Sequence, residues 1–236
     1  MSGSGTILEA ALGAGVPVTV VVADRPCRGL GVARHAGVEA VLVDRRRWGG
    51  YGPGFDRVGY TVAVTEALAS RRVDLVAMAG FGTVLAQPVH DTFGGRILNT
   101  HPSLLPAFPG WHAVADALAA GVAVTGCTVH LATLELDAGP VIAQAQVAVD
   151  PADTADTLHE RIKSLERRLY PETILRVLDE VGETGAVQIA HPDQAHPDQA
   201  RPDQTHPDQT HPDQARPDQV ATEGTEGVVN CSADHH

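Results

Sequence analysis

Runs of β-branched apolar residues, separated by helical patterns, constrain the fold of this chain most. The apolar runs are Val16–Ala23, Val38–Val43 and Asp74–Ala79. A nearly unbroken apolar run indicates a strand that is buried on both faces, as strands of parallel sheets are. Helical patterns at Gly29–Ala36 and Val58–Ser70 separate these runs. The alternation predicts an α/β class with a Rossmann-like, mostly parallel sheet and helices on both faces.

The domain organisation predicted for the 236 residues is one domain, residues 1–186, followed by a tail, residues 187–236. From His191 onward the tail repeats a pentapeptide of the type His/Arg-Pro-Asp-Gln-Ala six times. A proline in every repeat forbids a regular helix, and there is little apolar surface to bury. We expect a disordered, low-complexity tail. Its histidines could hold a metal loosely, but we favour repeat expansion without a site.

Charge and composition exclude several classes of partner. The chain has 17 basic and 29 acidic residues, which implies no basic face for nucleic acid. No apolar run approaches the length of a membrane span, and the start does not resemble a signal peptide. Cys27, Cys127 and Cys231 are scattered, so they give neither a disulfide framework nor a metal spacing. We expect a cytoplasmic protein that acts on small molecules without a metal or membrane. Whether it is a monomer or homodimer stays open.

The stretch from Ile97 to Gly110 contains the first candidate catalytic groups. Side chains on a strand alternate between faces, so Asn99 and His101 should point the same way. Pro102 cannot donate to a ladder and should end the strand. An amide that donates hydrogen bonds and an imidazole that exchanges protons would then lie at the mouth of a strand, where open α/β sheets bind ligands.

A third candidate, Asp137, lies in a loop between the apolar segments Cys127–Leu131 and Val141–Val147. A carboxylate beside a histidine orients the imidazole ring and favours its protonated form. The alternative is that Asn99 caps the strand end, His101 is a satisfied loop histidine and Asp137 is a turn residue. Spacing alone leaves both interpretations open, because such triads are recognised by geometry.

The string Asn99-x-His101-Pro-Ser-Leu-Leu-Pro106, followed by Asp137-x-Gly139-Pro140, resembles the folate-dependent formyltransferases over about residues 2–186. The resemblance implies the formyltransferase fold, a catalytic role for Asn99, His101 and Asp137, and 10-formyltetrahydrofolate as cosubstrate. It implies transfer of the formyl group to the amine of 5'-phosphoribosylglycinamide in purine synthesis.

Binding residues are also implied by the resemblance. The substrate would contact Gly5, Thr6, Ile7 and Glu166. A glycine-rich turn at a helix start offers free N–H groups to phosphate, although a flexible N-terminus explains it equally well. For Glu166, the alternative is an exposed partner of Arg161 or Tyr170 at helical spacing.

The folate would contact Arg57, Gly82, Thr83, Val84, Leu85 and Asn99. Arg57 could instead be a solvated surface charge. The family commonly has Met-Arg where this chain has Gly82 and Thr83. Backbone contacts to the pterin ring would survive that change, whereas a contribution from the arginine side chain would not.

Two rival functions share these motifs. One is another formyl-folate enzyme, a hydrolase or a transferase acting on initiator tRNA or amino sugars. The other is an inactive, folate-binding remnant. The family's first strand would end where Met1 stands, which favours the second rival unless the natural protein begins upstream of Met1. We expect such an upstream start, with an apolar strand ahead of the glycine-rich turn.

Overall fold

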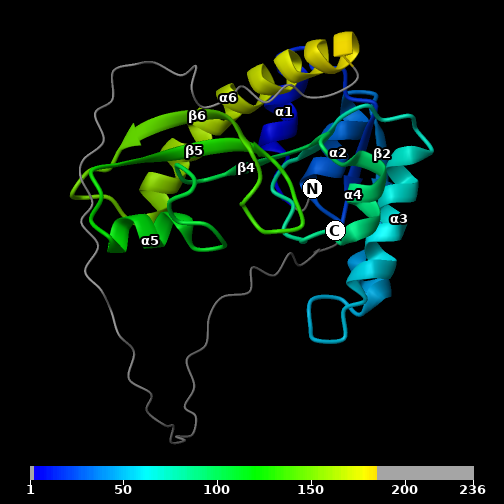
Figure 1. Cartoon of the computed structure of the whole chain (residues 1–236), viewed down its shortest axis with the longest axis horizontal. Coiled ribbons are helices and arrows are strands. Elements are labelled where there is room, and N and C mark those ends of the chain that lie inside the picture. The colour runs from blue at the N-terminus through cyan, green and yellow to red at the C-terminus, as the bar shows by residue number, and fades with distance from the viewer. Residues whose placement is uncertain (1–2, 185–236) are drawn as a thin grey trace, which may run out of the picture. The chain divides into compact units, whose positions relative to one another are not determined.

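The computed structural model describes residues 3–184, so the predicted tail, residues 187–236, lies outside the described residues. Helices and strands alternate along most of this range, as the sequence predicts (Figure 1). The helices are α1 (Thr6–Gly13), α2 (Arg28–His35), the 3-10 helix η1 (Arg45–Trp48), α3 (Arg57–Ala69), α4 (Gln87–Phe93), α5 (Ala113–Ala119) and α6 (Ala155–Thr184). The strands are β1 (Val20–Ala23), β2 (Glu39–Leu42), β3 (Val76–Met78), β4 (Ile97–His101), β5 (Val124–Leu131) and β6 (Val141–Ala148).

The strands form two sheets within the described residues. β1 pairs with β2 in parallel, and the second sheet has the order β3-β4-β5-β6. β3 and β4 are parallel, whereas β5 and β6 run antiparallel to their neighbours. The α/β class is confirmed, with antiparallel strands at one end. β5 and β6 need no crossover helix, because antiparallel neighbours can be joined directly by a loop.

Helices cover both faces, and the alternation of side chains along β4 separates the two cores. Ile97 packs into the cluster formed with α3 and α4, which includes Val64 and Val89. Leu98, the next residue, packs against Tyr170 of α6 on the opposite face. α1 lies beside α6 on that face (Figure 1). The sheet is therefore buried between α1 and α6 on one side and α3 and α4 on the other.

Local signals set most element boundaries correctly. β4 ends at His101, directly before Pro102, as expected from a residue that cannot donate to a ladder. Thr154 caps the start of the last helix, because its hydroxyl accepts a hydrogen bond from the Thr157 N–H at 3.2 Å. The apolar residues Leu158 and Ile162 follow at helical spacing and are fully buried. Of the helices within residues 3–184, none combines the length and apolar character that a membrane span requires.

The first predicted strand is shorter than expected. The apolar run begins at Val16, but β1 begins only at Val20. The predicted strand over Asp74–Ala79 is likewise reduced to Val76–Met78. A segment counts as a strand only where its backbone forms ladder hydrogen bonds with a neighbouring strand. β1 and β3 each have one such neighbour among the described residues, so fewer of their residues meet this criterion.

Candidate active site

Three sequence-predicted catalytic residues line one cavity of about 370 Å³ at the carboxyl end of β4. Asn99 and His101 come from β4 itself, and Asp137 comes from the loop between β5 and β6. The loop after β3 forms the opposite wall with Gly82, Thr83, Val84 and Leu85. Residues that the resemblance assigned to the reaction and to folate binding therefore meet in one place.

His101 is held by two oxygen acceptors. Its Nε2 lies 2.8 Å from the Phe108 carbonyl oxygen, and its Nδ1 lies 3.3 Å from Asp137 Oδ2. A carbonyl oxygen and an ionised carboxylate accept hydrogen bonds and cannot donate them. Each ring nitrogen of His101 therefore faces an oxygen atom, and these two contacts fix the orientation of the ring. Only 6% of the His101 side chain is exposed, so the ring lies in a poorly solvated site next to a carboxylate.

Asp137 is fixed by its backbone and by several donors. Its φ of 54° lies in the left-handed region, which few residues other than glycine adopt. The Gly110 N–H donates to Asp137 Oδ2 at 2.8 Å. Burial opposes the charged carboxylate, but hydrogen bonding with His130 and Gly110 and the attraction of His101 outweigh burial and lower the pKa of Asp137. Asp137 is thus ionised at neutral pH.

His130 is a site residue that the sequence analysis did not identify. It lies on β5 directly opposite Asn99 in the antiparallel register. Its Nε2 lies 3.1 Å from Asn99 Nδ2 and 3.6 Å from Asp137 Oδ1. His130 Nδ1 donates to the Leu131 carbonyl oxygen at 3.0 Å, which fixes the ring. Only the pairing of β4 with β5 could have pointed to it.

Glu166 is buried, which contradicts the alternative of an exposed surface partner. It accepts a hydrogen bond from the Thr100 hydroxyl at 3.0 Å, and Thr100 lines the candidate site. The two proposed partners are engaged elsewhere, because Arg161 pairs with Asp153 and the Tyr170 hydroxyl donates to Leu98. Burial raises the pKa of Glu166, although the Thr100 hydrogen bond acts in the opposite direction.

Arg45, at the start of η1, contacts the wall formed by residues 82–85. Arg45 Nη1 donates to the Thr83 hydroxyl at 2.8 Å. The guanidinium also lies 3.8 Å from the centre of the Phe55 ring and 4.7 Å from that of Tyr51. The chain thus places a guanidinium beside Thr83, although residue 83 itself is not arginine.

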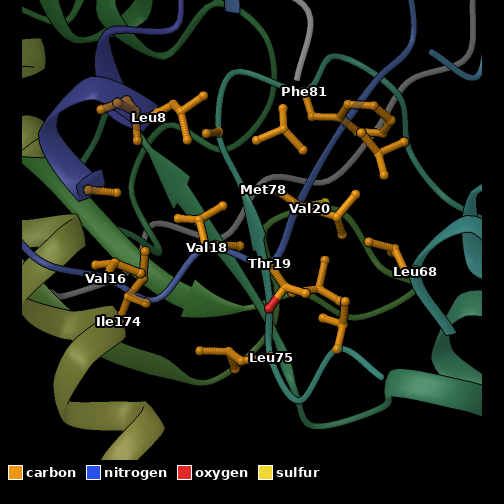
Figure 2. Close-up of a pocket in the computed structure, with 18 of the residues that line it drawn as sticks. Leu8, Val16, Val18, Thr19, Val20, Leu68, Leu75, Met78, Phe81 and Ile174 are labelled. Carbon is orange, nitrogen blue, oxygen red and sulfur yellow. The ribbon is translucent and has the colours of Figure 1, made fainter. Parts of the chain in front are cut away.

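The remaining predicted binding residues do not line this cavity. Gly5 precedes α1 with a φ of 82°, and a Cβ there would lie 2.8 Å from Gly29 Cα, so only glycine fits. Thr6 begins α1, while Ile7 lines a second cavity, of about 320 Å³, between β1 and β3 (Figure 2). Arg57 is exposed at the first residue of α3. The structure therefore leaves their assigned contacts as predictions.

Residues 6–174 match the formyl transferase family, and the chain belongs to that family. Over 173 residues it is 47% identical to phosphoribosylglycinamide formyltransferase of Mycobacterium tuberculosis, a match that covers 71% of this chain and 78% of that protein. Among solved structures it is similar to glycinamide ribonucleotide transformylase 1 of Symbiobacterium toebii, with a TM-score of 0.71, 44% identity, and coverage of 76% of this chain and 85% of that one. The phosphoribosylglycinamide formyltransferase of Bacillus halodurans gives a TM-score of 0.69 at 34% identity, covering 76% and 93% of the two chains.

Proposed function

We propose that this chain transfers the formyl group of 10-formyltetrahydrofolate to the amine of 5'-phosphoribosylglycinamide, a step of purine (IMP) biosynthesis. The observation that carries the proposal is the meeting of Asn99, His101 and Asp137 at one cavity. Family membership and 47% identity to a phosphoribosylglycinamide formyltransferase support the choice of substrate.

The oxyanion is stabilised by Asn99 and His101 in this proposal. When the substrate amine adds to the formyl carbon, the carbonyl oxygen gains negative charge. An amide N–H of Asn99 donates a hydrogen bond to that oxygen, and the Nε2–H of His101 donates a second one when it exchanges its acceptor, the Phe108 carbonyl, for the oxyanion. Such donors act most strongly in a site with little water, and losing one typically costs about 10²–10³ in rate.

Asp137 orients the histidine in this proposal. Its carboxylate faces His101 Nδ1 and is itself fixed by the Gly110 N–H. The attacking amine must lose a proton, and the departing folate nitrogen must gain one. Asp137 and His101 are the titratable pair placed to move that proton, directly or through water.

The cosubstrate would lie against the loop after β3. The backbone of Gly82, Thr83, Val84 and Leu85 offers hydrogen bonds to the pterin ring, and apolar neighbours such as Phe81 and Trp111 suit a flat aromatic group. Arg57 would contact the more distal part of the folate. 10-Formyltetrahydrofolate supplies the formyl group, and the proposal requires no metal.

The second substrate would contact α1 and α6. The N–H groups of Gly5, Thr6 and Ile7, at the start of α1, would bind its phosphate. Glu166 would accept hydrogen bonds from its hydroxyl groups, next to Thr100. We place the enzyme in the cytoplasm as a monomer or homodimer that acts on small molecules without nucleic acid or membrane.

A formyl-transfer assay on the 236-residue chain tests the proposal. Folate deformylation is followed by absorbance, with and without phosphoribosylglycinamide. We expect deformylation that depends on the amine and yields a formylated product. Deformylation without the amine would identify a hydrolase. Absence of both reactions, with folate still bound, would identify an inactive folate-binding protein.

A further inference from the structure

One histidine of the active-site cavity has no role in the reaction proposed above. His90 belongs to α4, lines the same cavity as the candidate catalytic groups, and is half-buried. Its imidazole ring makes no hydrogen bond with any other residue of the part of the chain that the structure describes. The neighbouring Asp91 is exposed and accepts a hydrogen bond from the Gln87 amide at 2.7 Å instead. The ring of His90 is therefore free to pair with a ligand in the cavity.

His90 is carried by a well-fixed part of the fold. Val89 and Phe93, four positions apart on α4, are both buried in the hydrophobic core. The His90 carbonyl accepts a hydrogen bond from the Gly94 N–H at 2.9 Å, which closes the last turn of α4. A Cβ at residue 94 would lie 2.5 Å from that oxygen, so this close approach requires glycine. The backbone of His90 is thus held at the cavity wall before any ligand binds.

The face of β4 that lines the cavity changes from apolar to polar along the strand. Ile97, Asn99 and His101 share this face, because side chains on a strand alternate with period two. Roughly 7 Å of strand separates Ile97 from Asn99. Ile97 packs with Val89 of α4 in the core, and His90 follows directly after Val89. The cavity therefore has an apolar end beside α4, where His90 lies, and a polar end with the candidate catalytic groups.

This change of polarity decides which half of a folate would face His90. The formyl group is carried by N10, which joins the bicyclic heterocycle to the benzoylglutamate. In the proposed reaction N10 lies near Asn99 and His101, so one half of the folate extends toward the apolar end. The glutamate has two carboxylates, and their burial among apolar side chains is costly. The uncharged heterocycle is therefore the half that lies beside His90.

A neutral imidazole suits the edge of that heterocycle. Burial lowers the pKa of His90, although the charge of Asp91 acts in the opposite direction, so the ring is neutral at pH 7. A neutral imidazole has one N–H donor and one nitrogen acceptor. The heterocycle carries N–H donors beside carbonyl and ring-nitrogen acceptors, so the two rings can pair. This pairing places no charge in the apolar end of the cavity.

We propose that the imidazole of His90 forms a hydrogen bond with the heterocycle of the folate cosubstrate and thereby contributes to the choice of cosubstrate. The inference rests on the proposed function and adds a binding residue to it. His90 lies away from the groups that face the formyl carbon, so it acts on affinity for the folate. Asn99 and His101, at the polar end of the cavity, act on turnover.

Calorimetric titration of the full 236-residue chain with tetrahydrofolate tests this assignment. His90→Val removes both ring nitrogens and should raise the Kd for tetrahydrofolate roughly tenfold, the loss expected for one hydrogen bond. His90→Gln keeps a donor and an acceptor, so its Kd should stay within about threefold of wild type. In steady-state kinetics His90→Val should raise KM for the formyl-folate by a similar factor and lower kcat by less than about twofold.

His159→Val is a matched control for these variants. His159 is half-buried on α6, and burial likewise lowers its pKa, but it does not line the active-site cavity. This substitution should leave the Kd for tetrahydrofolate unchanged. A spectroscopic measurement on the wild-type chain does not depend on how well a variant folds. The ring signal of His90 in proton–nitrogen spectra should shift when tetrahydrofolate is added, whereas that of His159 should not.

Two results would overturn the role of His90. One is a Kd that is unchanged in His90→Val or raised equally in His90→Gln, and the other is a His90 ring signal that does not move at saturating tetrahydrofolate. If the wild-type chain still binds tetrahydrofolate and transfers the formyl group, the proposed function stands without this residue. A wild-type chain that does not bind tetrahydrofolate would overturn both the role of His90 and the proposed function.

Discussion

The two cavities of this chain differ in what defines them. The candidate active site is formed by polar groups whose positions are fixed by hydrogen bonds, such as those of His101 with Phe108 and of Gly110 with Asp137. The second cavity, between β1 and β3, is lined mostly by apolar side chains. The candidate catalytic groups depend on the pairing of β4 with β5, which is intact. Chemistry and stability are therefore governed by different parts of the sheet, and each can be changed separately.

The largest expected effect is on turnover at the active site. Asn99→Ala and His101→Ala should each lower kcat by about 10²–10³, because each removes one oxyanion donor. Asp137→Asn should also lower kcat by orders of magnitude, since it removes the charge facing His101. Folate binding should persist in all three variants. Steady-state kinetics and a folate titration measure both quantities.

A matched control for these variants is His35→Ala. His35 is exposed at the end of α2, where its ring bonds to the Gly31 carbonyl. It should keep near wild-type turnover. Near wild-type turnover in His101→Ala as well would refute the catalytic assignment.

The next effect is on stability, and it contrasts the packed core with the second cavity, between β1 and β3. Leu98→Ala should lower the free energy of unfolding by about 2–5 kcal/mol, because Leu98 is fully buried in β4. Leu75→Ala should cost about 1 kcal/mol or less, since Leu75 is only half-buried and already borders a cavity. Urea unfolding of both variants provides the comparison. Equal losses of unfolding free energy would show that the surroundings of Leu75 are packed as tightly as the core.

Glu166 gives a smaller effect, which depends on pH. Burial raises its pKa in the folded state. The folded protein therefore holds a proton that the unfolded chain releases, so stability falls as pH rises from the unfolded pKa through the folded one. Glu166→Gln should be more stable than wild type above that window and should match it below about pH 4.

The same Glu166→Gln variant should raise KM for phosphoribosylglycinamide roughly tenfold, because a charged acceptor is lost. Thermal unfolding across pH and a KM measurement test the two parts. A stability difference that is independent of pH would contradict the assignment to ionisation of Glu166. An unchanged KM would remove Glu166 from the substrate site.

The smallest effect is expected from the tail. Deleting residues 188–236 should leave Tm and activity almost unchanged, because the repeat offers little apolar surface to bury. Differential scanning calorimetry on the shortened chain measures this. A loss of many degrees would mean that the tail contributes to the stability of the domain.

Local sequence rules determined the class of fold and the strand that carries the candidate catalytic residues. Apolar runs marked the buried strands, Pro102 ended β4 at His101, and Thr154 marked the start of α6. The period of two placed Asn99 and His101 at one cavity. These features follow from dihedral restrictions and hydrogen-bond requirements of neighbouring residues, which a sequence carries directly.

Tertiary structure alone decided the partners of these residues. The register of β4 against β5 placed His130 beside Asn99, and the approach of α6 to β4 buried Glu166 against Thr100. The contact between Arg45 and Thr83 joins segments that are 38 positions apart. The second cavity likewise could not be predicted from the sequence, because it depends on how β1 and β3 are placed around it. Such contacts depend on how sheets and helices pack, and many different sequence separations can satisfy the same packing.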